Sequence, residues 1–588
     1  MNDYFDQKSR LNYGALLYPD YGYELSFAVG CTYSLDFEAL ISVPLSLGAI
    51  EQSSSETMKN PFSILEGIRR STDKIAIFCN CDGIKMLRNI KPVYAMLDNS
   101  VFPVNLGDGK NFHPKIWVIR YKSTNNEPDM IKVLILSRNL TFDRSMDLVV
   151  ELKGLIKGRI KRQSKQKPIA DLLCFLADKC ETGSKAERIK SLADDVCRVD
   201  SFDIGNDFDD YSFYITGIPN HEDDSKIITS PCERILIVSP FLAETVVANM
   251  VKDCSKFDIN HKVNRVLISR RSSITPSIFS LFDEVYVPTE GLEDDSLLEE
   301  NEDYDKPKRE LHAKVIFKKT SAENAIFIGS FNATRNALNN NVEFMVRFKY
   351  KPYKASLDIV KNQFVNGSCP AFMRLHYPSS ADDDDVNEEE MTDFSDVVSS
   401  VVGGMVRMDD NGSYSTVIHF KSDNPDVSIS PLFIEKNRVF KEIRTEIVFD
   451  HMKTRELSEL FIVRKNNEER IIKISIDDLP VEERNDAVFS ELINTQPKLL
   501  QYVLFLLSDD PELATLEVNR LPQEGSNGEQ NGNDYIMSPT IYERMLLAAA
   551  REPEKIKAIK DAIKHFDEEK IDKGFVDVVN CFDSLIGD

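Results

Sequence analysis

Long apolar runs are missing from this sequence of 588 residues. It contains no uncharged apolar stretch of 18 residues, and the first residues, Met1 to Asp6, lack the basic and then apolar profile of a signal peptide. Glycine and proline are sparse, with 24 and 25 residues, which argues against a collagen-like or wholly disordered chain. We therefore expect a globular protein of several domains, located in the cytoplasm and without a membrane partner.

Cysteine is also scarce, because the chain has only ten cysteines and no Cys-x-x-Cys pair. A disulfide framework or a zinc site normally shows closely paired cysteines. The closest spacing, Cys79-Asn-Cys81, lies in an apolar stretch that is typical of a buried, reduced pair. The sequence therefore predicts free thiols, no metal site and no cofactor.

Basic residues are outnumbered, with 72 Lys and Arg against 96 Asp and Glu. The net charge of -24 argues at first against a nucleic-acid partner. However, two acidic runs, 293–305 and 382–396, carry 17 of the excess negative charges, so the rest of the chain is only weakly acidic. The segment 153–167 holds seven bases and no acid. Such a segment is either a strip that faces phosphates or a solvated basic loop.

Short strand-like runs alternate with helical periodicity in two successive parts, residues 24–152 and 212–350, which predicts an α/β fold class. Composition shifts then divide the remainder. We expect a first lobe at 1–205, a second lobe at 206–375, an acidic linker at 376–400, a mixed α+β module at 401–520, a flexible connector at 521–538 and C-terminal helices at 539–588.

One short pattern occurs twice, once in each lobe. It consists of His-x-Lys, a strand, a polar loop, a second strand and a Ser-x-Asn turn. The two copies comprise His113, Lys115, Ser137 and Asn139, and His312, Lys314, Ser330 and Asn332. An acid follows each turn on the next apolar run, Asp147 in the first copy and Glu343 in the second. A single His-x-Lys would carry no information, but a doubled pattern does.

Alternation along a strand places His and Lys on one face, with the Ser-x-Asn turn beside them. Two such copies brought together give two imidazoles that face one phosphate, surrounded by two Lys and two Asn. One neutral histidine can attack phosphorus while the other supplies a proton to the leaving oxygen. Lys and Asn stabilise the charge on the equatorial oxygens, and the acids orient the imidazoles. The pattern therefore predicts metal-independent cleavage of a phosphodiester.

The doubled pattern resembles the phospholipase D superfamily over about residues 1–375. The resemblance implies two α/β/α sandwich lobes that pack as a pseudo-dimer with their motifs facing each other, and a phosphohistidine intermediate. By analogy with two-copy relatives, it implies that His113 is the nucleophile and His312 the general acid, although the sequence itself leaves the order open. It also implies supporting roles for Ser137 and Ser330.

Two features depart from the pattern of this family. The usual Asp five residues after the motif lysine is Arg120 in the first copy and Lys319 in the second, and Leu136 stands where Gly is common. That Asp is also missing from the tyrosyl-DNA phosphodiesterase branch, so the resemblance favours a nuclease. The segment from Ser137 to Asp147 is similar to bacterial phospholipase D-like proteins that accompany helicases or restriction systems.

We therefore expect a nuclease or phosphodiesterase that cleaves DNA in bacterial defence, with a helicase or another defence protein as candidate partner. The alternatives are a phospholipase or phosphatidyltransferase, and a DNA-binding subunit that does not cut. The sequence leaves open whether the substrate is DNA or RNA, whether it is single- or double-stranded, and whether the protein forms a homo-oligomer. The acidic run at 293–305 ends seven residues before His312, and is either a plug of the site or a solvated loop.

Overall fold

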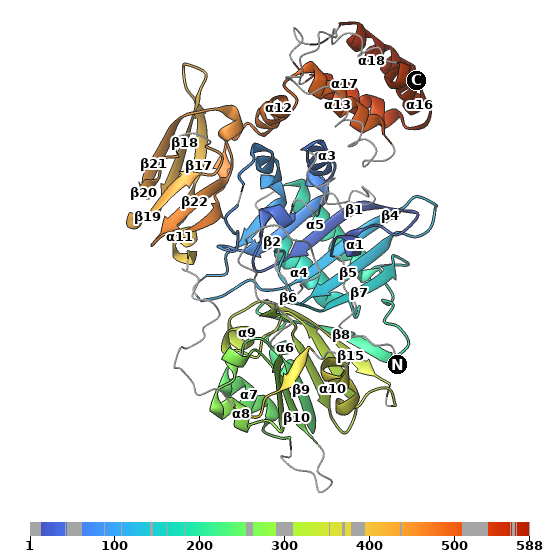
Figure 1. Ribbon diagram of the computed structural model, residues 1–588, viewed down its shortest axis with the longest axis vertical. Helices are drawn as coiled ribbons and strands as arrows, with labels where there is room; N and C mark the ends of the chain where they lie inside the picture. Colours follow the sequence, from blue (N-terminus) through green and yellow to red (C-terminus); the bar gives the residue numbers. More distant parts are fainter. Residues whose placement is uncertain are drawn as a thin grey trace.

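Two α/β lobes, a β-sandwich module and a group of helices make up the chain (Figure 1). The computed structural model describes residues 13–40, 43, 61–87, 89–107, 109–141, 145–161, 163–180, 183–254, 263–289, 310–351, 353–366, 371–377, 394–434, 438–508, 539–564, 566, 571 and 573–586. The acidic run at 293–305, most of the run at 382–396 and the connector at 521–538 lie outside these residues.

The first lobe contains a six-stranded sheet in the order β3-β2-β1-β4-β5-β7. β1, β2 and β3 pair in parallel, whereas β4, β5 and β7 continue the sheet in antiparallel pairs. The bounds are β1 (Tyr23–Cys31), β2 (Ile75–Asn80), β3 (Val101–Val104), β4 (Ile116–Ser123), β5 (Met130–Leu136) and β7 (Val149–Leu155), with helices α1 (Tyr13–Leu17), α3 (Pro61–Ser71), α4 (Lys167–Ala177) and α5 (Ser184–Cys197) and 3-10 turns η2 (Thr72–Lys74) and η3 (Pro92–Ser100). Alternate strand residues face α4 and α5 on one side of the sheet and α3 on the other, so both faces of the sheet are buried.

Trp117, the only tryptophan, is 2% exposed and packs in the core on the α3 side of β4. It lies against Gly30 of β1, where any side chain would collide with the indole ring. Trp117 therefore serves core packing.

The second lobe repeats the first. Within its eight-stranded sheet, the order β11-β10-β9-β13-β14-β15 corresponds strand by strand to β3-β2-β1-β4-β5-β7, with the same parallel and antiparallel pairs. The bounds are β8 (Phe208–Thr216), β9 (Arg234–Val238), β10 (Arg265–Ile268), β11 (Glu284–Pro288), β13 (Val315–Lys319), β14 (Asn324–Gly329), β15 (Glu343–Tyr350) and β16 (Phe372–Arg374), with α6 (Asp224–Ile228), α7 (Glu244–Val251), η4 (Arg271–Ser273), α8 (Pro276–Ser280), α9 (Arg335–Asn339) and α10 (Leu357–Val365). The predicted α/β class and the doubled architecture are confirmed.

The two lobes share one continuous core, in which the inner faces of both sheets pack with α4 and α5. A short parallel pair, β6 (Ser145–Met146) with β12 (Glu310–Leu311), joins them, and a bridge between Phe112 and Val342 does the same. These two contacts are equivalent. In each, the residue before a motif histidine (Phe112 or Leu311) pairs with the residue before an acid of the other lobe (Val342 or Met146). The lobes therefore meet at their motifs.

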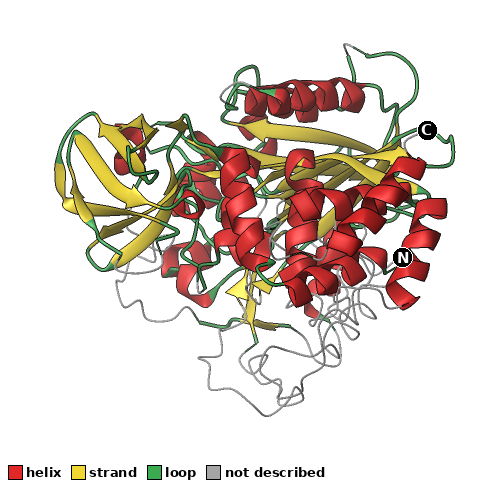
Figure 2. Cartoon of the chain, turned by 90° about the horizontal axis from the view of Figure 1, so that it is seen from above, coloured by secondary structure: helices red, strands yellow, loops and turns green. Residues whose placement is uncertain are grey.

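The C-terminal part begins with two four-stranded sheets that pack face to face (Figure 2). Their strands are β17 (Val401–Met408), β18 (Tyr414–Phe420), β19 (Asn424–Pro431), β20 (Lys441–Ile443), β21 (Glu446–Met452), β22 (Leu460–Lys465), β23 (Glu468–Lys473) and β24 (Ile476–Asp477), with η5 (Thr454–Glu456) and α12 (Val481–Leu492). The helical group consists of α13 (Gln496–Leu507), α16 (Pro539–Arg551), α17 (Pro553–Lys564) and α18 (Lys573–Ile586).

Two segments differ from the expected division. The end of the expected linker forms α11 (Ser395–Ser400), because Phe394 and Val397 insert into the core of the β-sandwich. Helix α13 lies within the expected mixed module at 401–520, but it packs with α16 and α17 of the expected C-terminal helices. The buried residues of α13 belong to the same hydrophobic core as the α3 side of the first lobe. The β-sandwich also contributes residues to this core, so the β-sandwich and the helical group both pack on that lobe.

Candidate active site

The eight motif residues lie at strand ends on the side of each sheet that meets the other lobe. His113 and Lys115 precede β4, and His312 and Lys314 occupy the same place before β13. Ser137 follows β5 directly, as Ser330 follows β14, and each Asn comes two residues later. The histidines and lysines thus stand in extended lead-in segments rather than on the strands themselves, which differs from the sequence expectation in detail only.

Backbone hydrogen bonds hold each motif histidine against the opposite lobe. The His113 amide donates to the Val342 carbonyl at 3.0 Å, and the His312 amide donates to the Met146 carbonyl at 3.1 Å. Val342 precedes Glu343, and Met146 precedes Asp147. Each histidine is therefore placed beside the acid-bearing segment of the other copy.

Glu343 is the partner of His113. Its carboxylate accepts a hydrogen bond from His113 Nδ1 at 2.8 Å, and its side chain is fully buried. The same carboxylate accepts hydrogen bonds from the Ser330 hydroxyl and, at 2.9 Å, from the Asn341 side-chain amide. With Nδ1 donating, the lone pair of His113 lies on Nε2, which the Lys115 ammonium approaches to 3.0 Å.

The electrostatics keep His113 neutral. Burial, together with the positive charges of Lys115 and Lys314, lowers the pKa of His113 to about 4, although Glu343 opposes this shift. Lys314 belongs to the other copy, so its effect shows that the two motifs share one electrostatic environment. A partly buried, neutral imidazole with an oriented lone pair is what a nucleophile toward phosphorus requires.

His312 has a partner that the sequence did not suggest. Arg270, which follows β10, donates from Nη2 to His312 Nε2 at 3.2 Å and from Nε to the Leu311 carbonyl at 3.2 Å. Its guanidinium lies over the ring of Phe241, 4.6 Å from the centroid. Nothing in the sequence around Arg270 marks it, because only the sheet register brings it to the motif.

The lysines, serines and asparagines complete the site in matching ways. Lys115 and Lys314 are each 2% exposed, and each donates to the carbonyl oxygen of its own motif histidine. The hydroxyls of Ser137 and Ser330 accept hydrogen bonds from the next strand at 2.8 and 3.0 Å, so both fix the turns.

Asn139 and Asn332 share an unusual feature. Each has a buried side-chain carbonyl oxygen for which no hydrogen-bond partner is found among the described residues. An amide oxygen can only accept a hydrogen bond, so a phosphate oxygen at this place would be contacted by the Nδ2 amide of the same side chains. Thr334, two residues after Asn332, accepts a hydrogen bond from the Ala337 amide and so starts α9.

Asp147 lies near a second arginine. Arg138, the middle residue of the first Ser-x-Asn turn, has Nη1 3.6 Å from the Asp147 carboxylate and donates from Nη2 to the Thr141 carbonyl at 2.7 Å. The corresponding residue of the second copy, Phe331, is buried in the core of the second lobe. The two turns are therefore alike in backbone but differ in charge.

Two other sequence features serve structure. Arg120, at the position of the family's usual Asp, pairs with Asp129 at 2.9 Å and Asp195 at 2.6 Å within the first lobe. In the basic segment at 153–167, four lysines make ion pairs: Lys153 with Asp20, Lys161 with Asp200, Lys165 with Asp210 and Lys167 with Asp171. Each of these four lysines faces a carboxylate, which favours the interpretation as a solvated basic loop over a strip that faces phosphates.

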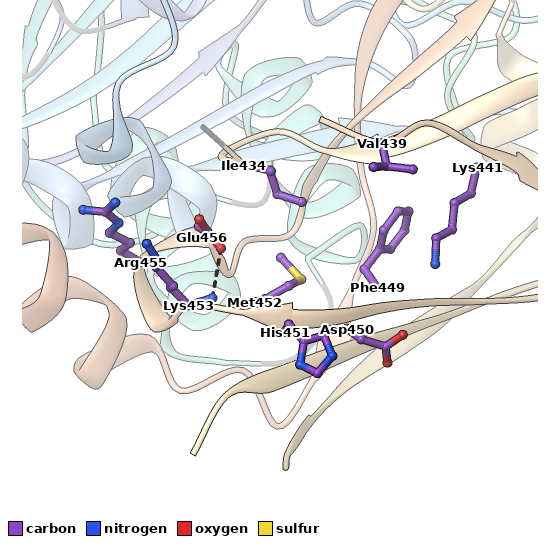
Figure 3. A pocket seen from close by; sticks show the side chains of 10 residues that line it. All are labelled: Ile434, Val439, Lys441, Phe449, Asp450, His451, Met452, Lys453, Arg455 and Glu456. Atoms are coloured by element: carbon purple, nitrogen blue, oxygen red, sulfur yellow. Dashed lines mark hydrogen bonds between the residues drawn. The ribbon is translucent and has the colours of Figure 1, made fainter. Parts of the chain in front are cut away.

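A cavity of about 540 Å³ lies elsewhere, in the β-sandwich (Figure 3). It is lined by side chains of β20, β21 and η5, and by Ile434 and Val439. None of its lining residues belongs to either lobe, and several of its polar groups are bonded within the module, such as Glu456 to the Lys453 amide at 2.9 Å. It forms no part of the motif site.

Comparisons with known proteins add little to this geometry. No family model and no curated protein matches the sequence. Similar solved structures include polyphosphate kinase from Porphyromonas gingivalis, with 13% sequence identity, coverage of 60% of this chain and 44% of that chain, and a TM-score of 0.31. A mutant of yeast tyrosyl-DNA phosphodiesterase has 10% sequence identity, coverage of 61% of this chain and 88% of that chain, and a TM-score of 0.34. Phosphatidylserine synthase from Haemophilus influenzae has 9% sequence identity, the match covers 62% of this chain and 85% of that chain, and the TM-score is 0.34. This chain spans less than half of the polyphosphate kinase, and likeness at these TM-scores carries no argument about activity.

Among the described residues, no helix combines the length and the apolar character needed to cross a membrane.

Proposed function

We propose that the protein is a phosphodiesterase that cleaves nucleic acid, with DNA as the expected substrate, through a phosphohistidine intermediate and without a metal. The observation that carries this proposal is the Glu343–His113–Lys115 contact, which spans both lobes and presents a neutral imidazole next to an ammonium. The choice of DNA and the place in bacterial defence rest on the sequence resemblance alone, and the cytoplasmic location rests on the composition of the sequence.

In this mechanism His113 Nε2 attacks phosphorus, and the bond to the leaving oxygen breaks as His312 donates a proton to that oxygen. Lys115, Lys314, Asn139 and Asn332 stabilise the negative charge on the equatorial oxygens. Glu343 holds the Nδ1 proton and stabilises the cationic imidazole as the N–P bond forms. Water, with His312 as the base, then releases the product from His113.

The test is cleavage of labelled single- and double-stranded DNA, RNA and phosphatidylcholine in EDTA. We expect cleavage of nucleic acid, and we expect a covalent phosphate adduct on the parent chain that mass spectrometry detects. His113→Ala should abolish both the adduct and the cleavage, and His312→Ala should slow release of the leaving group. Full activity of His113→Ala, or cleavage of the lipid alone, would contradict the proposal.

A further inference from the structure

The two halves of the site can be compared residue by residue because the two sheets have the same strand order. Cys31 pairs with Phe78 in the first lobe, and Val238 pairs with Ile268 at the same place in the second. Two residues beyond Phe78 lies Asn80, and two residues beyond Ile268 lies Arg270. Asn80 and Arg270 are therefore counterparts.

The hydrogen bonds of these counterparts agree with the register. Asn80 Oδ1 accepts from the Phe112 amide at 2.8 Å, and Arg270 Nε donates to the Leu311 carbonyl at 3.2 Å. Each thus holds the residue before the motif histidine of its own lobe. One counterpart is a neutral amide and the other a guanidinium, so the first is uncharged where the second is positive.

A second pair of counterparts differs in the same sense. In the Ser-x-Asn turns the middle residue is Arg138 in the first copy and Phe331 in the second. Arg138 is near Asp147, whose neighbour Met146 accepts the backbone hydrogen bond of His312. Both arginines therefore belong to the His312 side of the site.

The His113 side has a tyrosine ring and a neutral amide where the His312 side has Phe241 and the Arg270 guanidinium. The Tyr33 ring lies 5.1 Å from the His113 ring, between centroids, and Asn80 is buried. Asp147 offsets the charge of Arg138, so the positive charge that distinguishes the two sides of the site is that of Arg270, whose counterpart Asn80 is neutral. A single symmetric phosphodiester does not require such a difference, because the motif lysines and asparagines already treat both halves alike.

Resting on the proposed function, we propose that the His312 side binds a second phosphate of the substrate, adjacent to the scissile one, and that Arg270 is the residue that recognises it. A guanidinium binds phosphate through a planar fork of N–H donors. Because Nε and one N–H of Nη2 donate to the Leu311 carbonyl and to His312 Nε2, the fork toward phosphate is the end-on one of Nη1 and the second N–H of Nη2, and stacking on Phe241 fixes its orientation. An uncharged or aromatic part of the substrate, such as a nucleoside, binds on the His113 side, next to Tyr33. Consecutive phosphates are a property of a polynucleotide and not of a phosphatidylcholine headgroup.

The test measures binding, so that it does not depend on turnover. The ligands are the thymidine dinucleotide TpT and its two derivatives with one further phosphate, at the 5′ end or at the 3′ end. Their affinities for the full chain carrying His113→Ala are measured by calorimetry at low salt. We expect one of the two phosphorylated ligands to bind at least about tenfold more tightly than TpT, because one phosphate more adds a charge-assisted contact.

Arg270→Gln in the same background should reduce this gain to less than about threefold, and Arg270→Lys, which keeps the charge, should retain part of it. Arg271→Gln is the matched control, because it removes the same charge from the next, exposed residue and should leave the gain intact. Equal affinities for all three ligands, or a full gain in Arg270→Gln, would overturn the inference.

Failure of this inference and failure of the proposed function give different results. Cleavage of bis(4-nitrophenyl) phosphate by the parent chain in EDTA reports the phosphodiesterase chemistry by itself. If that cleavage occurs while the three dinucleotides bind alike, the second-phosphate site is refuted and the proposed function stands. If the gain depends on Arg270 but no diester is cleaved, the site stands and the proposed function is refuted.

Discussion

At the scale of single residues, burial and nearby charges together set the pKa of His113. Burial disfavours the protonated form most, Glu343 opposes this effect, and Lys115 and Lys314 add to it. The neutral form therefore persists down to about pH 4, well below the ordinary pKa of 6.5. If His113 is the nucleophile as proposed, its imidazole is neutral from weakly acidic to neutral solution.

This balance gives a prediction with two opposite signs. Lys314→Met removes a positive charge and should raise the pKa of His113, so that protonation begins at a higher pH. Glu343→Gln removes the negative charge and should lower the pKa further. Titration of the chain with ¹³C-labelled histidines by NMR measures both shifts, and only eight histidines have to be assigned.

The activity profile provides the second readout of the same prediction. The acid limb of kcat/KM reports the free enzyme, so it should move upward in Lys314→Met and downward in Glu343→Gln. A loss of rate alone would fit a merely structural role, whereas shifts in opposite directions would not. Shifts in the same direction in both variants would contradict the assignment.

At the scale of elements, one buried ion pair fastens the C-terminal part to the first lobe. Arg484 of α12 donates to the Asp98 carboxylate of η3 at 2.7 Å, and the side chains are 1% and 0% exposed. The Ser458 hydroxyl and the Glu459 amide donate to the same carboxylate at 3.3 and 3.1 Å. The position of the β-sandwich relative to the first lobe is therefore set by a fully bonded carboxylate.

Breaking this pair should destabilise the chain strongly. In Arg484→Met a buried carboxylate loses its cation, and we expect the free energy of unfolding to fall by about 3–5 kcal/mol. Urea unfolding followed by fluorescence and circular dichroism measures the change. Arg444→Met is the control, because the pairs of Arg444 with Asp423 and Glu442 are half exposed and should contribute less than about 1 kcal/mol. Equal effects of the two variants would contradict this account.

At the scale of the whole molecule, neither lobe contains a complete site. His113 comes from the first lobe and Glu343 from the second, and His312 is held by the backbone of the first. The shared core, built from both inner sheet faces with α4 and α5, fixes the lobes in this arrangement. One chain therefore supplies both halves of one site.

This arrangement predicts the outcome of mixing two impaired chains. His113→Ala and His312→Ala each remove one histidine from every site, so a mixture of the two should cleave no faster than the sum of the separate variants at any ratio. The assay is cleavage of bis(4-nitrophenyl) phosphate after joint unfolding and refolding as well as after simple mixing. Activity that returns in the mixture would mean that two chains exchange halves and build the site between them.

The sequence by itself determined the fold class and the identity of the motif residues, for a physical reason that is local. Strand and helix periodicity depends on neighbours in the chain, and the His-x-Lys and Ser-x-Asn patterns recur at fixed places in that succession. The doubled pattern therefore located His113, His312 and their lysines, serines and asparagines without knowledge of any long-range contact.

Only the tertiary structure decided which groups face one another. Glu343 is 230 positions from His113 and Arg270 is 42 positions from His312, so no periodicity connects these pairs. The basic segment at 153–167 appeared open in the sequence because its carboxylate partners come from elsewhere in the chain. Charge and pKa depend on distance in space, and the packing of the two lobes sets those distances.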